Sequence, residues 1–240
     1  MRNGQIRFAE YHWERLFEGM RLLHIQSPGA FRQKLEEQIR RTVAKNRLES
    51  LCRIRLQIYA GDGGLYDPGS STGFVIENFP LESAVPELNE NGLILGVADA
   101  VKHSGPYSHL KCSNALPYAI AAKQARLALW NDALLRNAHG NIADSTIANI
   151  FWTKNKKIYT TPLSEGGVAG VMRRHLLELL PNIGYEVGEK ALPIKALADM
   201  DSVFLCNSIR GIRWVRAVGE YEYPIHELQG LWHKVRASLL

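Results

Sequence analysis

Cysteine is scarce in this chain of 240 residues, and long apolar runs are missing. The three cysteines, Cys52, Cys112 and Cys206, are far apart and lack the spacing of a metal-ligand set. They predict reduced thiols in a cytoplasmic protein rather than a disulfide framework. No apolar run reaches the ~18 residues of a membrane span, and the N-terminus lacks the apolar core of a signal peptide, so we expect no membrane insertion.

Positive charge is not concentrated anywhere, although the net charge is +5. The densest basic stretch, residues 32–47, has Glu36 and Glu37 interleaved with its basic residues, as on a solvated helix face. No basic stripe with interleaved aromatic residues and no nucleic-acid-binding motif is present. We therefore expect no nucleic-acid partner and keep that class only as a minor alternative. A small anionic substrate accounts for the positive excess equally well.

The first part of the sequence predicts a small α+β domain over residues 1–80. Residues 2–8 resemble half of a hairpin with its turn at Asn3-Gly4, and apolar spacing then predicts two helices and two alternating strands. The helices are expected at 9–23 and 27–46, and the strands at 51–59 and 72–79. The glycines between residues 61 and 69 do not follow the Gly-x-Gly-x-x-Gly pattern or precede a predicted helix, which argues against dinucleotide binding.

A linker is predicted over residues 81–91, because residues 80–90 carry two prolines and three glutamates. The rest of the chain, residues 92–240, predicts a larger domain in which strands and helices alternate. Strands are expected at 92–98, 132–136, 150–153, 157–160 and 202–206, and helices at 114–126, 168–180 and 226–240.

Three segments of the larger domain carry the chemistry. They are residues 108–114, which contain Lys111, residues 140–152, and residues 161–173. Lys111 follows a turn-rich stretch at the end of a predicted strand, where partial desolvation lowers the pKa of an amine and makes it a better nucleophile. A single lysine is most often a solvated surface charge, so this feature alone assigns no function.

The order and spacing of these segments resemble those of the class IV aminotransferases, the fold-type IV pyridoxal-phosphate enzymes. That family has a Lys with an Asn three or four residues later, then a Gly-x-x-x-Glu-x-x-x-x-Asn-Ile/Leu-Phe segment. A Thr-Pro turn and a Gly-Ile/Val-x-Arg helix start follow. The resemblance implies an α+β to α/β fold of two domains, in which the larger domain has a β-barrel-like sheet. It also implies pyridoxal 5'-phosphate as cofactor and a homodimer.

The resemblance carries over to individual positions of this sequence. Lys111 matches the lysine that binds the cofactor covalently and then moves protons. Asp144 matches the glutamate that pairs with the cofactor's ring nitrogen, and it is one methylene shorter. Arg15, Ser208 and the backbone amides of Val171 and Met172 match the groups that bind the phosphate, since a guanidinium and a helix N-terminus both suit an anion.

The sequence departs from the family pattern at its start. By resemblance, family members carry a further stretch before the position of Met1, with a strand that shapes the substrate pocket. We therefore expect that the recorded chain begins late and that its small domain is truncated. No metal site is expected.

The spacing of three residues from Lys111 to Asn114 resembles the lyase and D-amino-acid branches of the family more than the branched-chain one. We therefore expect a 4-amino-4-deoxychorismate lyase, which releases pyruvate to give 4-aminobenzoate in folate synthesis. An aminotransferase with the same cofactor is the alternative, because Arg213-Trp214 replaces the usual proline-containing segment on the substrate side. A non-catalytic relative that serves as a binding protein is the third reading.

Overall fold

The computed structural model describes residues 1–64, 69, 71–82 and 88–239. The chain forms two compact units, Met1–Ala84 and Val85–Leu240, and each is described by itself. Residues 83–87 of the predicted linker, together with part of the glycine-containing loop over residues 61–71, lie outside the described residues. None of the helices in the described part of the chain has the length and apolarity to span a bilayer.

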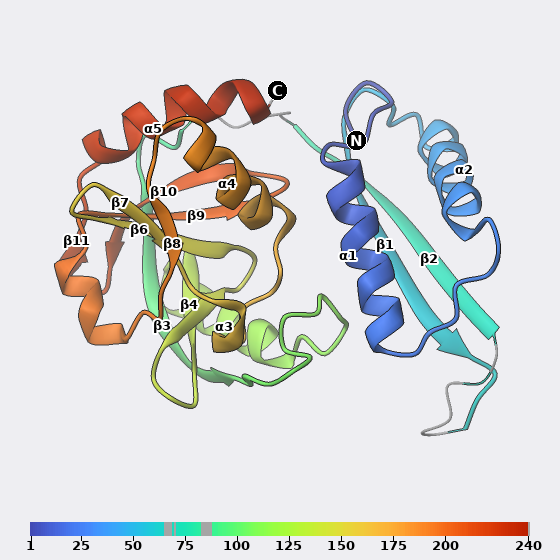
Figure 1. Ribbon diagram of the computed structural model, residues 1–240, viewed down its shortest axis with the longest axis horizontal. Helices are drawn as coiled ribbons and strands as arrows, with labels where there is room; N and C mark the ends of the chain where they lie inside the picture. The colour runs from blue at the N-terminus through green and yellow to red at the C-terminus, as the bar shows by residue number, and fades with distance from the viewer. Residues whose placement is uncertain (65–68, 70, 83–87, 240) are drawn as a thin grey trace. The chain divides into compact units, whose positions relative to one another are not determined.

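The first unit is two helices on one face of a hairpin (Figure 1). Its elements are α1 (Ala9–Leu22), α2 (Phe31–Lys45), β1 (Cys52–Gly61) and β2 (Ser71–Pro80). The strands pair antiparallel, and alternate residues of both strands point to the helices, as the period of two predicts. Trp13, Leu35 and Val43 are buried in the core between the helices and these strands.

The N-terminal segment is shorter in structure than the predicted hairpin. Asn3 and Gly4 do form a turn, and Arg2 and Gln5 pair across it. Pairing does not continue to Phe8, which has a φ of 52° and directly precedes α1. Arg2 pairs with Leu51 as well, so this turn is attached to the start of the β1–β2 hairpin.

The second unit is built on a nine-stranded mixed sheet. Its strands are β3 (Leu93–Lys102), β4 (Asp132–Asn137), β5 (Ile142–Ser145), β6 (Asn149–Lys154), β7 (Lys157–Thr160), β8 (Val187–Glu189), β9 (Ser202–Asn207), β10 (Gly211–Val218) and β11 (Tyr221–Glu222). They follow the order β5-β4-β3-β10-β9-β6-β7-β8, with β11 paired to β10. Pairing is parallel between β3 and β4, β3 and β10, and β7 and β8.

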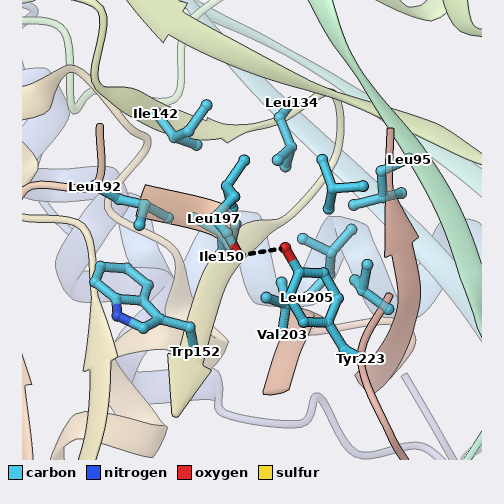
Figure 2. Packing of buried hydrophobic residues seen from close by; sticks show 12 residues of the cluster. Leu95, Leu134, Ile142, Ile150, Trp152, Leu192, Leu197, Val203, Leu205 and Tyr223 are labelled. Carbon is cyan, nitrogen blue, oxygen red and sulfur yellow. Dashed lines mark hydrogen bonds between the residues drawn. The ribbon is translucent and has the colours of Figure 1, made fainter. Parts of the chain in front are cut away.

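This sheet must curl, because β5 and β6 are far apart in the strand order but adjacent in the chain. Only a short turn separates them, closed by a 2.8 Å hydrogen bond from the Ser145 amide to the Ala148 carbonyl. The sheet therefore bends back on itself as a half-barrel around an apolar core, and the predicted α+β fold with a barrel-like sheet is confirmed. Figure 2 shows this core, in which the Tyr223 hydroxyl donates to the Leu197 carbonyl at 2.9 Å.

Three α-helices accompany the described part of this sheet: α3 (Leu116–Leu127), α4 (Val171–Asn182) and α5 (His226–Arg236). Short 3-10 turns lie at Leu163–Glu165, Ile194–Asp199 and Ala237–Leu239. The helix α3 packs on β3 and β4, where Ala121 and Ala125 lie buried beside Leu135. The helix predicted from residue 168 begins at Val171 instead, because Gly170 has an extended backbone, with φ −71° and ψ 135°.

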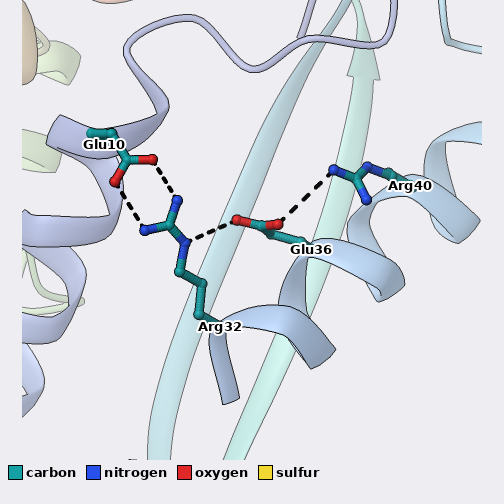
Figure 3. A network of polar contacts seen from close by, with 4 residues as sticks. All are labelled: Glu10, Arg32, Glu36 and Arg40. Atoms are coloured by element: carbon teal, nitrogen blue, oxygen red, sulfur yellow. Dashed lines mark hydrogen bonds and ion pairs between the residues drawn. The ribbon is translucent and has the colours of Figure 1, made fainter. Parts of the chain in front are cut away.

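A polar network on the surface joins the two helices of the first unit (Figure 3). The Arg32 guanidinium donates to both carboxylate oxygens of Glu10 on α1 and, at 2.9 Å, to Glu36 on its own helix. Arg40 lies 3.9 Å from the other oxygen of Glu36. Exposed ion pairs contribute little stability, about 0–1 kcal/mol each, so the apolar core holds this unit together.

Candidate active site

Asp144 is a buried acid of the second unit. It lies on β5 opposite Leu135 of β4, and paired residues of neighbouring strands point to the same side of a sheet. Leu135 packs against α3, so the carboxylate lies between the sheet and that helix. Its side chain is only 2% exposed, and this burial raises the pKa of Asp144 to about 6.

The two oxygens of the Asp144 carboxylate have different surroundings. Oδ2 accepts a hydrogen bond from the Tyr118 hydroxyl at 2.8 Å and one from the Val168 amide at 3.0 Å. Oδ1 is buried and has no hydrogen-bond partner among the described residues. An unpaired buried acceptor is costly, so it favours a ligand that brings a donor, above all a positively charged one.

Lys111 lies close enough to act electrostatically on this acid. The positive charges of Lys102 and Lys111 both lower the pKa of Asp144, against the larger effect of burial. The segment before Lys111 is anchored on two sides. The Ala169 amide donates to the His109 carbonyl at 2.9 Å, and Lys102 Nζ donates to the Ser108 carbonyl at 3.1 Å. Lys111 itself is exposed within its unit, as a reactive amine must be.

The loop before α4 approaches the sheet so closely that it requires glycine. A Cβ atom on Gly167 would lie 2.7 Å from the Ala143 carbonyl oxygen. One on Gly170 would lie 1.9 Å from Oδ1 of Asn149, whose amide group donates to the Val168 carbonyl at 2.8 Å. These contacts give a physical reason for the glycines of the 161–173 segment: they let the loop reach both β5 and β6.

The N-terminus of α4 presents free backbone amides. The first hydrogen bond of the helix ladder runs from the Arg174 amide to the Gly170 carbonyl at 3.0 Å. The amides of Val171 and Met172 therefore have no acceptor within the helix, and the helix dipole makes such a position suited to an anion. Both side chains are buried, which holds this end of the helix in place.

Ser208 lies in the turn between β9 and β10, half-buried. The turn is held by Oδ1 of Asn207, which accepts from the amides of Ile209 and Arg210 at 3.0 and 2.7 Å. Cys206 at the end of β9 pairs with Asn149, the residue that contacts Gly170. The turn with Ser208 is therefore at the same end of the sheet as the N-terminus of α4.

Arg15 is in the first unit, on α1, so its position relative to these groups is not defined. Burial lowers its pKa. Burial, and then the charge of Arg15, also lower the pKa of His12 to about 4, so this histidine is neutral near pH 7. The role of Arg15 toward a phosphate stays a prediction, as do the cofactor roles of Lys111, Asp144, Val171, Met172 and Ser208.

Sequence reasoning missed three groups around Asp144, namely the Tyr118 hydroxyl, Lys102 and the Val168 amide. One signal pointed to Tyr118, because helical spacing places it on the same face of α3 as the buried Ala121 and Ala125. Lys102 is only 9% exposed at the end of β3, and no pattern in the sequence distinguishes it from a surface lysine. Within the described residues, no cluster of His, Cys, Asp and Glu could hold a metal ion.

Comparison with known proteins agrees with this geometry. The family model "Amino-transferase class IV" matches residues 1–218. An aminodeoxychorismate lyase of Vibrio harveyi is 30% identical over 95% of this chain and 85% of its own length. The crystal structure of 4-amino-4-deoxychorismate lyase from Pseudomonas aeruginosa is 30% identical, with a TM-score of 0.88 over 100% of this chain and 88% of that one.

A probable branched-chain-amino-acid aminotransferase of Rickettsia felis is 28% identical over 85% of this chain and 70% of its own length. The matches to both kinds of relative cover most of this chain. The chain belongs to the class IV aminotransferase family of enzymes, as its three motifs predicted.

Proposed function

We propose that this protein is a pyridoxal-phosphate-dependent lyase that releases pyruvate from 4-amino-4-deoxychorismate and gives 4-aminobenzoate, a step in folate synthesis. The observation that carries the proposal is the buried Asp144 carboxylate beside Lys111, with Oδ1 left without a partner among the described residues. Similarity to aminodeoxychorismate lyases over nearly the whole chain supports the choice of reaction. The similarity to branched-chain aminotransferases makes transamination the second candidate.

The residues present fit the proposed cofactor. Asp144 Oδ1 would accept a hydrogen bond from the protonated ring nitrogen, and Lys111 would hold the cofactor covalently. The amides of Val171 and Met172, with Ser208 and Arg15, would bind its phosphate. When bound, the cofactor supplies an electron sink that stabilises negative charge on the substrate carbon.

In the proposed reaction, the residues of this chain hold charges and move a proton. The Asp144 carboxylate, in a site of low dielectric, stabilises a cationic donor at Oδ1, and such a donor would in turn lower the pKa of the acid. The Lys111 amine takes the proton from the substrate carbon that bears the nitrogen. The C–O bond at the neighbouring ring position then breaks, and the leaving enolpyruvate takes up a proton to become pyruvate. The ring becomes aromatic, which makes the elimination favourable.

The turnover requirement separates the two candidate reactions. A lyase needs no second substrate, so the protein should release pyruvate from 4-amino-4-deoxychorismate in many-fold molar excess over enzyme, without added keto acid. After one half-reaction, the cofactor of an aminotransferase carries the amino group and must pass it to a keto acid before the next turnover. An aminotransferase therefore shows ping-pong kinetics. Pyruvate should be measured by coupled reduction, with Lys111→Ala as the inactive control.

Multiple turnovers only with an amino donor and a keto acid would replace the lyase by an aminotransferase. No turnover in either assay, by a protein that binds the cofactor, would favour the non-catalytic reading. The proposed location of the reaction is the cytoplasm, in keeping with Cys52, Cys112 and Cys206 as free thiols.

We also propose a homodimer, and an apolar stripe on α3 supports it. Leu116, Ile120 and Leu127 are 66%, 50% and 77% exposed. Their spacing of four and seven residues places them on one face of the helix, opposite the buried Ala121 and Ala125. Exposed apolar patches mark interaction sites, and a second copy of the same chain is the commonest partner.

The dimer is testable by sedimentation. The wild-type protein should sediment at twice the 27.0 kDa of one chain, and Ile120→Lys should shift it toward the monomer by placing a charge in the interface. Ala122→Lys places the same charge at an exposed residue of the same helix that lies away from this stripe, and it is the matched control. A wild-type monomer at micromolar concentration would contradict the proposal.

A further inference from the structure

Tyr118 and Asp144 form a hydrogen-bonded pair that joins α3 to β5. We propose that Tyr118 is a positioning residue, matched to an aspartate at position 144, that directs Oδ1 of this acid to the cofactor's ring nitrogen. The proposal rests on the proposed function only for the identity of the group that Oδ1 meets. The pairing of the two side chains is a property of the protein alone.

Two donors from different elements define the orientation of the carboxylate. The Val168 amide, in the loop before α4, donates to Oδ2 at 3.0 Å, and the Tyr118 hydroxyl on α3 donates to the same atom at 2.8 Å. With one donor, the carboxylate could still rotate about that contact. With two donors on Oδ2, the plane of the carboxylate is set, and Oδ1 keeps one direction without a partner of its own among the described residues.

The ring of Tyr118 is itself held in place. It packs with the buried cluster that contains Ala121, Ala125 and Leu135. On another side, Lys102 Nζ lies 5.4 Å from the ring centroid, within the range of a cation–π contact. The same Nζ donates to the Ser108 carbonyl at 3.1 Å, three residues before Lys111. The position of Tyr118 is thus tied both to the sheet and to the lysine segment.

The length of the acid explains why a tyrosine suits this position. Where the family pattern has glutamate, this chain has an aspartate, which is shorter by one methylene, about 1.5 Å. On the Oδ2 side there is no room for a longer side chain, because Tyr118 and Val168 are already at hydrogen-bond distance. A glutamate would have to give up these bonds. Removing the Tyr118 hydroxyl would open a space about as long as the methylene group that a glutamate adds at position 144.

The charges around the pair give a test that needs no cofactor. The groups that face Asp144 are Tyr118 from α3, Lys102 from β3, Lys111 and the Val168 amide. Burial raises the pKa of Asp144 to about 6, while the two hydrogen bonds and the two lysines lower it. Because the Tyr118 hydroxyl bonds to the charged form, its removal must raise that pKa further.

The first experiment is therefore a carboxyl titration of the cofactor-free protein by NMR, with 13C-labelled aspartate and Asp144→Asn to assign the resonance. Tyr118→Phe should raise the midpoint by about one pH unit, as for loss of one charge-assisted hydrogen bond. Tyr107→Phe, at an exposed tyrosine, is the matched control and should leave it unchanged. An unchanged midpoint in Tyr118→Phe would overturn the pairing.

The second experiment measures cofactor affinity by absorbance titration. Tyr118→Phe and Asp144→Glu should each weaken pyridoxal-phosphate binding by about 10- to 100-fold. The double variant should bind better than Asp144→Glu alone, because the longer acid then takes the space of the missing hydroxyl. Additive losses in the double variant would show that tyrosine and aspartate are not a matched pair.

The proposed function and the positioning role of Tyr118 can be contradicted separately. A wild-type protein that binds no pyridoxal phosphate contradicts the proposed function, while the NMR titration still decides whether Tyr118 holds Asp144. A wild-type protein that binds the cofactor, with no loss in Tyr118→Phe, contradicts the positioning role alone.

Discussion

Replacing Lys111 by alanine should abolish covalent attachment of the cofactor and lower turnover by at least about 10³-fold, because the variant loses both the anchoring amine and the proton carrier. The fold should persist, since Lys111 is exposed and lies outside the strands and helices of its unit. The measurement is the intact mass after borohydride reduction in the presence of pyridoxal phosphate, together with the rate of pyruvate release.

Lys102 is the other amine close to Asp144, and it should not take over. Its side chain is 9% exposed, and its Nζ is bonded to the Ser108 carbonyl, so it is poorly placed to meet an incoming aldehyde. Lys123→Ala, at an exposed lysine of α3, is the matched control and should keep the adduct. A reducible adduct that persists in Lys111→Ala would show that the assignment is wrong and would make Lys102 the first alternative.

Asp144→Asn should lower turnover and raise the stability of the cofactor-free protein. Loss of one preorganised charge next to the reacting system raises a barrier by about 3–4 kcal/mol, which is about 10²- to 10³-fold in rate. The asparagine oxygen can still accept from Tyr118 and Val168, so the local structure should remain. The rate of pyruvate release at saturating substrate is the measurement.

The stability gain follows from the raised pKa of the acid, about 6 in the folded protein. An unfolded aspartate titrates near 3.9, so the native state binds this proton more tightly than the unfolded state. The bound proton therefore makes its full contribution to the free energy of unfolding below pH ~4, and this contribution is lost as the pH rises through 6. Above that pH, ionising the buried acid costs roughly 2–3 kcal/mol.

Urea unfolding of the cofactor-free wild type and of Asp144→Asn should therefore give a difference in unfolding free energy that grows from pH 4 to pH 8. Thr153→Val, at a buried residue of β6 nine positions after Asp144, is a control without an ionisable group. A difference in unfolding free energy that does not depend on pH would mean that burial does not raise the pKa of Asp144. Wild-type activity of the asparagine variant would rule out its proposed contact with the ring nitrogen.

Sequence patterns predicted many of the elements, including the buried strands β4, β6 and β9, but they missed the short buried strand β5 and the bulged strand β10. All four residues of β5 are buried, so no alternation marks it as a strand, and Asp144 within it looks like a turn residue. The strand β10 was not predicted. Its pairing with β3 shifts register between Val215 and Ala217, and this bulge interrupts the period of two.

The candidate site was predictable only in part, for a similar reason. Lys111, Asp144 and Gly170 stand in motifs whose spacing can be read along the chain. The contact of Tyr118 with Asp144 joins residues 26 positions apart and depends on the pairing of β4 with β5. No local pattern specifies that pairing. The partners of a buried acid therefore appear only when the sheet has been assembled.

The glycine-containing loop before α4 has a consequence for how this enzyme can change over generations. Its consecutive amides at Val168 and Ala169 bind Asp144 and the segment of Lys111, and two residues later it opens the helix end proposed to hold the phosphate. A substitution that moves this loop alters the acid, the lysine segment and the anion site at once. Selection therefore cannot change cofactor affinity and reactivity independently through this loop. New substrate specificities must arise on the substrate side of the pocket.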